Sequence, residues 1–267
     1  MLAAQRQSWI LEEVRKHGAV RVNDLVAALN VSDMTVRRDL DALAEQGLVT
    51  KVHGGATAHG GGSTDEPSFS VKAARERRAK EAIARAAAEL VQPGTAIGVS
   101  AGSTTYAFAR RLARMPDLTV VTNSPPVADL LHTLPGPAQT VILTGGVRTI
   151  SDALVGPVAI QAIRRLHLDC VFIGVHGVDA EAGFTSPNLM EAETNRALVS
   201  TARRLVVMAD HTKWGVVGLS EIAALHEASV LVSDDGLGAG ARQVLRESVG
   251  ELIVVPAEGA GANEEEE

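Results

Sequence analysis

Small polar residues cluster at four turns in the C-terminal part of the sequence, each directly after an apolar, strand-like run. The turns are Ser100 to Thr105, Thr122 to Ser124, Thr144 to Gly146 and Gly174 to Gly177. Glycine lets a backbone approach an anion closely, and hydroxyls with free N–H groups at a helix start can hold a phosphate. A single turn of this kind is more often a simple helix cap. Four of them on one sheet edge predict a pocket with many polar donors and at least one anion site.

Charged residues accompany these turns at two further places. Glu191 and Glu193 open a helix after Asn188, and Asp210 and Lys213 follow another apolar run. Lys213 could neutralise a phosphate, and Glu191 could bind or deprotonate a hydroxyl-bearing carbon skeleton. The alternative is structural: acidic residues stabilise the first turn of a helix, and aspartate caps turns. Both interpretations stay open at this point.

A second kind of chemistry is suggested by residues 31–40, Val-Ser-Asp-Met-Thr-Val-Arg-Arg-Asp-Leu. Ser32 is a strong N-cap candidate, because its hydroxyl can accept a backbone N–H of the first helical turn. Val36, Leu40 and Leu43 recur at spacings of four and three, so they share the inward face of one helix.

The polar residues Thr35, Arg37 and Arg38 fall outside that apolar stripe. Arginine pairs bidentately with guanine or with phosphate, so such a helix suits a DNA major groove. An ordinary surface helix with solvated charges is the alternative, and for this stretch alone the two are equally good. The flanking sequence has to decide between them.

Three helices and a short strand are predicted around these arginines. The helices cover 3–17, 22–29 and 32–46, Asn30-Val31 is the turn between the second and third, and 48–52 alternates like a strand. His53 to Ala56 then turns away. Two short helices joined by a tight turn, followed by a small hairpin, form a winged helix-turn-helix.

The stretch Ser32 to Leu40, then Gly47-Leu48-Val49 and His53-Gly54-Gly55-Ala56, resembles the DNA-binding domain of the DeoR family of bacterial transcriptional regulators. The resemblance implies that residues 20–39 form the helix-turn-helix proper. It also implies a helix that faces double-stranded operator DNA and a wing near the DNA backbone. The DNA-binding residues expected from this are Ser32, Thr35, Arg37, Arg38, Lys51 and His53.

From residue 94 onward, strand-like and helix-like segments alternate. The predicted strands are 96–99, 118–122, 139–143, 169–175, 205–209, 230–232 and 252–254, with helices at 105–113, 155–165 and 190–203 between them. Near-continuous Val, Ile and Leu indicates strands covered on both faces. The fold class is therefore α/β: a winged helix-turn-helix followed by a doubly wound, Rossmann-like domain, whose ligands bind beyond the carboxyl ends of the strands.

A long helix is predicted over 71–91, with Lys72, Arg75, Arg77, Arg78 and Lys80 exposed.

This second part is also similar to the DeoR family, in its C-terminal sensor domain, which is similar to sugar-phosphate isomerases of the ribose-5-phosphate isomerase type. The resemblance implies a phosphorylated sugar or polyol as effector. The sequence departs from the family pattern at Ser100, where an acidic residue is usual, at Asn195, where Lys is usual, and at His176, where a small residue is expected. The expected effector-binding residues are Gly102, Ser103, Thr104, Thr105, Thr122, Asn123, Gly145, Gly146, Gly174, His176, Glu191, Asp210 and Lys213.

Composition limits the remaining possibilities. The chain has 267 residues, 46% of them hydrophobic and 3% aromatic, and a net charge of −7. Residues 1–56 hold seven basic and seven acidic residues, so we expect modest DNA affinity per domain and a homodimer or homotetramer. The single Cys170 is expected to be a buried, reduced strand residue. No signal peptide or membrane-length apolar run is present, so we expect a cytoplasmic protein without membrane contact, metal or cofactor.

The expected organisation is a winged helix-turn-helix over 1–56, a linker over 57–70, a sensor domain over 71–256 and an acidic, disordered tail over 257–267. Three functions fit these features to different degrees. The favoured one is a non-enzymatic regulator, most simply a repressor of carbohydrate genes that its effector releases from DNA. The alternatives are a sugar-phosphate isomerase with Glu191 as base, which Ser100 disfavours, and a constitutive DNA-binding protein with an inert core.

Overall fold

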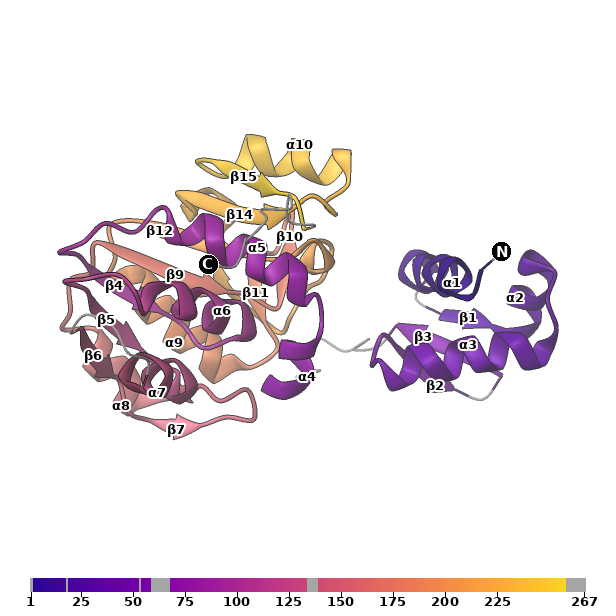
Figure 1. Cartoon of the computed structure of the whole chain (residues 1–267), viewed down its shortest axis with the longest axis horizontal. Coiled ribbons are helices and arrows are strands. Elements are labelled where there is room, and N and C mark those ends of the chain that lie inside the picture. Colours follow the sequence, from indigo (N-terminus) through magenta and orange to yellow (C-terminus); the bar gives the residue numbers. More distant parts are fainter. Residues whose placement is uncertain (1, 18, 53, 59–67, 134–138, 258–267) are drawn as a thin grey trace, which may run out of the picture. The chain divides into compact units, whose positions relative to one another are not determined.

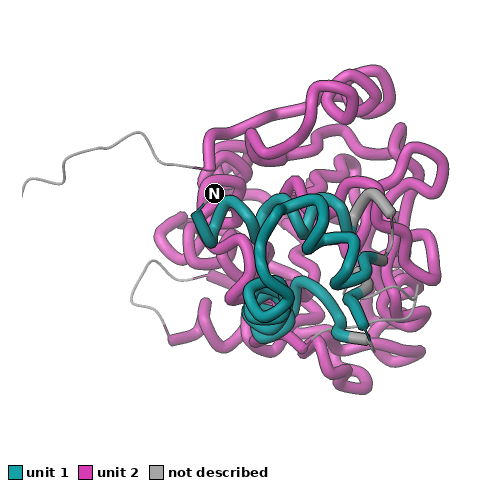
Figure 2. Tube along the Cα trace, turned by 90° about the vertical axis from the view of Figure 1, so that its right-hand side faces the viewer, with its two compact units in different colours: residues 1–65 teal, residues 66–267 magenta. Residues whose placement is uncertain are grey.

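The computed structural model describes residues 2–17, 19–52, 54–58, 68–133 and 139–257. The chain divides into two compact units, residues 1–65 and 66–267, which Figure 2 shows in different colours. Each unit has its own hydrophobic core and is described by itself. The residues expected to form the acidic tail, apart from Ala257, lie outside the described residues, as does His53.

The N-terminal unit is a winged helix-turn-helix. Its antiparallel sheet has the strand order β1-β3-β2, and its core includes the fully buried Ile10 and Val36. Asn30 has a left-handed backbone with φ of 50° and ends α2, which makes the tight turn expected there. The elements are α1 (Ala3–His17), β1 (Ala19–Arg21), α2 (Val22–Leu29), α3 (Asp33–Glu45), β2 (Val49–Val52) and β3 (Gly55–Ala58).

The segment expected to be a linker, 57–70, contains regular structure at both ends. Thr57 pairs with Ala19, and Ala58 pairs with Val49, because β3 is the central strand of the small sheet. At the other end α4 (Phe69–Ala74) has already begun. The single helix expected over 71–91 is two helices, α4 and α5 (Arg77–Ala88), because Glu76 takes a left-handed backbone with φ of 48° between them.

The C-terminal unit is built on a seven-stranded parallel sheet, which confirms the doubly wound α/β fold (Figure 1). The strand order is β15-β14-β12-β9-β4-β5-β6, so the chain reverses direction across the sheet between β4 and β9. In open α/β sheets this reversal point is where ligands bind. The strands are β4 (Ala96–Val99), β5 (Thr119–Thr122), β6 (Thr140–Leu143), β9 (Cys170–Gly174), β12 (Leu205–Met208), β14 (Val230–Asp234) and β15 (Leu252–Val255).

Helices cover both faces of this sheet. On one face α5, α6 (Ser103–Leu112) and α7 (Pro125–Thr133) enclose a core in which Phe108 stacks on Phe172 with ring centroids 4.5 Å apart. On the other face α8 (Pro157–Ile163), α9 (Leu189–Ser200) and α10 (Ala239–Ser248) pack around residues such as Leu198. The alternation of strand and helix in the sequence therefore produces the expected three layers.

Two small sheets and two short helical turns were not anticipated by the sequence. The hairpin of β7 (Val147–Arg148) and β8 (Leu154–Val155) follows β6. The antiparallel strands β10 (Gly177–Asp179), β11 (Gly183–Ser186) and β13 (Ser220–Ala223) form the other sheet. The short turns are η1 (His211–Lys213) and η2 (Leu225–Glu227). Within the described part of the chain, no helix is long and apolar enough to cross a membrane.

Candidate functional site

The helix expected to read DNA is α3, and its start is capped as predicted. The Ser32 hydroxyl accepts a hydrogen bond from the backbone N–H of Thr35 at 3.2 Å and lies 2.8 Å from the Thr35 hydroxyl. Val36 and Leu40 point into the core, while Arg37 and Arg38 are exposed. The cap and the apolar stripe together fix the rotation of α3, so both arginines face away from the core.

Two of the expected DNA-binding cations are already paired with carboxylates. Arg37 forms a bidentate pair with Asp33, with Nε 2.6 Å from Oδ1 and the second nitrogen 3.2 Å from Oδ2. Lys51 on β2 forms an ion pair with Asp41 of α3. All four side chains are about half exposed, so DNA phosphates can compete for both cations. Within the described residues, no carboxylate lies within ion-pair distance of Arg38.

Asp39 is a residue whose role the sequence did not reveal. It sits next to Arg38 but is 3% exposed, and it accepts hydrogen bonds from Arg6, at 2.5 and 3.2 Å, and from Gln7 at 3.2 Å. These contacts fasten α1 to α3. A buried carboxylate needs such partners, so Asp39 orients the helix and does not face DNA.

In the C-terminal unit, the four polar turns all lie at the carboxyl edge of the sheet. Asn123, after β5, accepts a hydrogen bond from the Ala101 N–H at 2.9 Å and donates to the Leu154 carbonyl at 3.2 Å. The buried Thr122 hydroxyl donates to the Val99 carbonyl at 2.7 Å. Thr122 and Asn123 therefore use their side chains to hold the ends of β4 and β5 together.

The turn after β4 leaves a helix start without a side-chain cap. Gly102 is the N-cap of α6 with φ of 149°, and Thr105 donates its hydroxyl to the Gly102 carbonyl at 2.9 Å. Ser103 is partly exposed, whereas Thr104 and Thr105 are buried. The N–H groups of the first turn and the Ser103 hydroxyl thus remain as donors for an anion. Gly174 lies beside this turn, since a β-carbon there would contact the Thr105 methyl at 3.7 Å.

The turn after β6 approaches the first turn of α9. Gly146 has φ of 124° and lies so close to β8 that a β-carbon would fall 2.6 Å from the Val155 carbonyl oxygen. This close approach forms the β7–β8 hairpin, whose Thr149 donates to the Glu191 carboxylate at 2.6 Å. The structure therefore brings Glu191 next to the turn that holds Gly145 and Gly146.

After β12, Asp210 is the N-cap of the η1 turn, which ends at Lys213. Asp210 is 2% exposed, and its Oδ1 caps η1 by accepting from the Thr212 N–H at 3.1 Å. Its other oxygen, Oδ2, is buried without a hydrogen-bond partner among the described residues. A buried oxygen of this kind normally bonds a ligand or a water. No side-chain hydrogen bond within the described residues joins Asp210 or Lys213 directly to the turn after β4.

Lys80, on α5, is a buried cation beside this turn, and the expectation that it is exposed is wrong. Its side chain is packed under the joint between α4 and α5, where Nζ donates to the carbonyls of Lys72 at 2.5 Å and Arg75 at 2.6 Å. Burial lowers the pKa of Lys80 to about 8, the Asp210 carboxylate opposes this, and the Lys213 ammonium adds to it. In the sequence Lys80 is one of several basic residues of a predicted helix, and this pattern indicates exposure. Its burial depends on the packing of α4 against α5, which the pattern does not contain.

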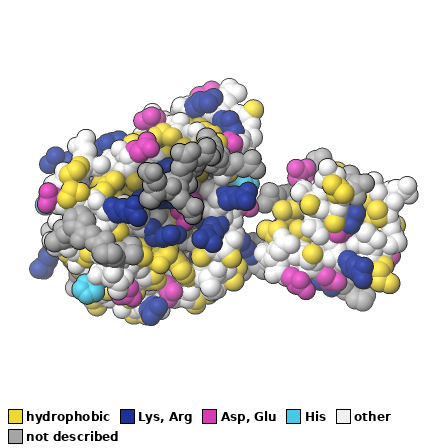
Figure 3. All heavy atoms as spheres, in the orientation of Figure 1, with side chains coloured by type: hydrophobic (Ala, Val, Ile, Leu, Met, Phe, Trp, Pro, Cys, Tyr) yellow, Lys and Arg dark blue, Asp and Glu magenta, His cyan; other side chains and the backbone are white. Residues whose placement is uncertain are grey.

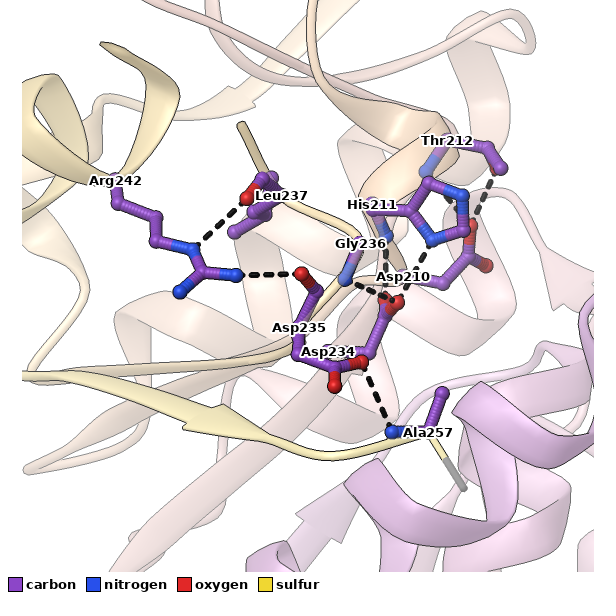
Figure 4. Close-up of polar contacts among 9 residues, drawn as sticks. All are labelled: Asp210, His211, Thr212, Asp234, Asp235, Gly236, Leu237, Arg242 and Ala257. Carbon is purple, nitrogen blue, oxygen red and sulfur yellow. Dashed lines mark hydrogen bonds and ion pairs between the residues drawn. The ribbon is translucent and has the colours of Figure 1, made fainter. Parts of the chain in front are cut away.

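A second unanticipated group is the pair of His211 and Asp234 (Figure 4). Asp234 is 1% exposed and is the last residue of β14, the neighbour of β12. Its carboxylate accepts from the backbone N–H of His211 at 2.7 Å and lies 2.7 Å from the His211 ring nitrogen Nδ1. This hydrogen bond raises the pKa of His211. The backbone of Gly236 packs on the ring, because a β-carbon there would lie 2.5 Å from it.

The three departures from the family pattern occupy distinct places. Ser100 is fully buried at the reversal point of the sheet, where its hydroxyl accepts from the Gly174 N–H at 3.2 Å. His176 is half-buried, and its N–H donates to the Thr185 carbonyl at 3.0 Å. Asn195 lies one helical turn after Glu191, and its buried Oδ1 has no hydrogen-bond partner among the described residues. Ser100 therefore joins two strands, while Asn195 offers a free acceptor.

Two further groups have structural explanations. Cys170 is buried in β9, and burial raises the pKa of its thiol to about 11, which leaves it unreactive. Lys and Arg side chains gather over α5 and α6 in Figure 3, where Arg110 and Arg111 both pair with Glu81, at 3.0 and 3.1 Å.

Among the residues that the structure describes, no group of His, Cys, Asp and Glu side chains has the geometry of a metal site.

A winged helix-turn-helix on a doubly wound sensor domain defines a ligand-responsive class of transcriptional regulators. Comparison with known families agrees: residues 6–60 match the DeoR-like helix-turn-helix domain, and residues 75–235 match the DeoR C-terminal sensor domain. The chain belongs to the DeoR family, whose members are non-enzymatic transcriptional regulators. The family membership expected from the sequence is thereby confirmed, and the isomerase alternative is not supported.

Similar proteins cover nearly the whole chain. The HTH-type transcriptional regulator GlpR of Haloferax volcanii is 34% identical over 258 residues, which are 95% of this chain and 98% of that protein. The lactose phosphotransferase system repressor of Staphylococcus aureus strain N315 is 35% identical over 231 residues, 86% of this chain and 91% of that protein. Among solved structures, ribose 5-phosphate isomerase A of Methanocaldococcus jannaschii aligns over 51% of this chain and 53% of its own, with 18% identity and a TM-score of 0.37.

Proposed function

We propose that this DeoR-family regulator is a repressor of carbohydrate metabolism genes, released from its operator by a phosphorylated sugar or polyol. The observation that carries the effector half is a pair of buried oxygens, Asp210 Oδ2 and Asn195 Oδ1, which have no hydrogen-bond partner in the described part of the chain. Both lie on elements that also hold expected effector-binding residues. A lactose-system repressor among the relatives supports the link to carbohydrate genes.

The phosphate of the effector binds at the start of α6. Gly102 to Thr105 supply N–H groups and the Ser103 hydroxyl, and Lys213 supplies the positive charge. Gly145, Gly146 and Gly174 keep the neighbouring turns free of side-chain bulk. Glu191, Asn195, His176 and Asp210 provide acceptors and donors for the hydroxyls of the carbon skeleton. Thr122 and Asn123 contribute indirectly, because their side-chain hydrogen bonds hold the ends of β4 and β5 in place.

The DNA half of the proposal rests on α3 and the wing. Arg37 and Arg38 read or neutralise DNA, Ser32 and Thr35 contact it at the helix start, and Lys51 and His53 contact its backbone. The N-terminal unit has no net positive charge over residues 1–56, so one copy binds weakly. A homodimer or homotetramer compensates by placing two winged helices on two half-sites.

Lys80 links the effector site to the segment that leads toward the winged helix. Its ammonium holds the last turn of α4 by donating to the Lys72 and Arg75 carbonyls. Its pKa also depends on the charges of Asp210 and Lys213. A phosphate near Lys213 attracts Lys80 away from those carbonyls and loosens α4. The coupling between effector and DNA can be no larger than the difference in effector affinity between the two states.

The experiment is a gel-shift titration of the full chain on the DNA upstream of its own gene, repeated with a panel of phosphorylated sugars and polyols. We expect retardation in the absence of effector and release by one class of phosphorylated compound. The unphosphorylated sugar serves as the matched control and leaves the complex intact. Retardation that no compound reverses removes the effector half, and no retardation at any concentration removes the repressor function.

A further inference from the structure

Exposed apolar side chains gather around the β6 edge of the seven-stranded sheet. Among the described strands β6 has a neighbour only on one side, and Ile142 on it is 38% exposed. Beyond β6, Val147 and Ile150 of the hairpin and Val158 of α8 are 62–63% exposed. Parallel strands are normally buried on both faces. An edge strand with exposed apolar side chains is therefore expected to pack against another protein surface.

The elements that carry these side chains are neighbours in the fold. Strand β7, with Val147, pairs with β8, and a β-carbon on Gly145 would contact the Val158 side chain at 3.6 Å. A β-carbon on Gly156, directly before α8, would lie 3.0 Å from the Met190 methyl group. Leu189 and Met190, at the start of α9, are 55% and 42% exposed. We call the six side chains the β6-edge surface; they are Ile142, Val147, Ile150, Val158, Leu189 and Met190.

The size of the β6-edge surface matches one half of a dimer interface. At roughly 30 Å² for each exposed methyl or methylene group, the six side chains present on the order of 400 Å² of apolar area. A stable dimer buries about 800 Å² on each copy, somewhat more than half of it apolar. The largest apolar patches on monomeric proteins are of similar size and are commonly functional. The area therefore suits a single protein partner of ordinary size.

Charge favours a second copy of this chain as that partner. Between Thr140 and Ile163 the only charged residues are Arg148 and Asp152, and they pair with each other at 2.8 Å. A two-fold interface places the same patch against itself, so any net charge on it would repel. This segment carries none, and charged residues that border the surface are paired: Lys72 donates to the Ser151 hydroxyl of the hairpin at 2.7 Å, and Glu193 of α9 pairs with Arg196 at 2.6 Å.

We propose that the β6-edge surface is the dimer interface of this protein, with a second copy of the chain as its occupant. The proposal deepens the proposed function, because two copies present two winged helices to DNA. The interface also borders the effector site, since Thr149 of the hairpin bonds Glu191 at 2.6 Å. An effector that engages Glu191 therefore acts beside the contact between the two copies.

The test is the mass of the full chain in solution, measured by light scattering after gel filtration over a hundredfold range of concentration. We expect a dimer or tetramer for the wild type and at least a tenfold weaker association for the double variant Val147→Asp with Val158→Asp. Met34→Asp, at a 70% exposed position of α3, is the matched control and keeps the wild-type mass. A monomeric wild type, or a double variant with the wild-type mass, overturns the proposal.

Hydrogen exchange of the wild type provides a readout that does not depend on the folding of a variant. Dilution should increase exchange in 140–158 and in the first turn of α9, and leave α10 unchanged. If dilution increases exchange in other segments instead, the dimer interface lies elsewhere and the proposal is overturned. Neither measurement uses DNA or effector, so failure here is distinct from failure of the repressor function.

Discussion

Asp234 holds His211 at two points, its backbone N–H and its ring nitrogen Nδ1, both at 2.7 Å. Burial alone would raise the pKa of Asp234, but the hydrogen bonds from the His211 ring and backbone outweigh it and lower that pKa. The same contact raises the pKa of His211. The pair fixes the η1 turn, which carries Asp210 and Lys213, to the neighbouring strand β14.

This pair makes stability depend on pH. A histidine whose pKa is raised on folding stabilises the fold fully below its unfolded pKa of about 6.5, and the stabilisation is lost as pH rises through the folded pKa. The carboxylate contribution is lost at the acid end, as pH falls through the lowered pKa of Asp234. We therefore expect the free energy of unfolding of the wild type to fall as pH rises above about 6.5. Asp234→Asn should show a flatter profile there; parallel profiles would exclude the pair as the cause.

Replacement of Arg37 by alanine should weaken operator binding. A bidentate arginine contact contributes on the order of a tenfold to hundredfold change in affinity. The measurement is a gel-shift titration at fixed salt. Arg85→Ala removes the same charge from an exposed position of α5 and serves as the matched control. An Arg37→Ala protein with the affinity of this control would place Arg37 outside the interface.

Replacement of Asp33 by asparagine should strengthen DNA binding, in contrast to the loss expected for Arg37→Ala. Asp33 engages Arg37 in the free protein and adds a negative charge at the start of α3. Its removal frees the guanidinium and lowers the repulsion of DNA phosphates, so we expect severalfold tighter binding to nonspecific DNA. The salt dependence of binding should become steeper. Unchanged affinity at low salt would mean that the Asp33–Arg37 pair persists, or is irrelevant, in the complex.

Ser103→Ala and Lys213→Ala should each blunt the effector response and leave operator affinity unchanged. Both residues belong to the proposed phosphate site, and neither lies in the N-terminal unit. The measurement is the effector concentration that releases half of the bound DNA, which should rise at least tenfold. Ser200→Ala, at the far end of α9, is the control for the loss of a hydroxyl. Release at the wild-type concentration by both variants would relocate the pocket.

Lys80 should make effector affinity fall above its pKa of about 8. The ammonium form attracts a phosphate, and it is lost as pH rises through that value. Lys80→Arg keeps its charge at alkaline pH and should therefore flatten the profile, while Lys80→Gln should show weak affinity throughout. Effector binding is measured by calorimetry between pH 7 and 9, with correction for ionisation of the phosphate. A wild type and a Lys80→Arg protein with identical profiles would show that Lys80 does not face the effector.

Burial of the Lys80 ammonium also costs stability below its folded pKa. Because the folded pKa is lower than the ordinary value, the unfolded chain binds more protons between about pH 8 and 10.5, and stability rises with pH across that range. Retention of such a group at this expense is typical of functional sites.

Several features of this protein follow from local sequence signals. The seven apolar runs became the seven strands of the sheet, since Val and Ile favour strands and turn residues separate the runs. Ser32 caps α3 as expected, because the cap depends only on the residues that follow it within one turn. The four polar turns meet at one sheet edge because parallel strands share a direction. The break at Glu76 was missed, since it has no glycine or proline to mark it.

The sequence by itself determined the strands of the main sheet, the family and the sheet edge that we propose for the effector, because these depend on short-range spacing and on motif residues. Only the tertiary structure decided which distant side chains meet. Asp39 and Arg6 are 33 residues apart, and Asp234 and His211 are 23 apart. Lys80 becomes buried because α4 folds back over it, which no helical periodicity predicts. The physical reason is that burial and pairing of a charge depend on the packing of several elements, while capping and periodicity act within one.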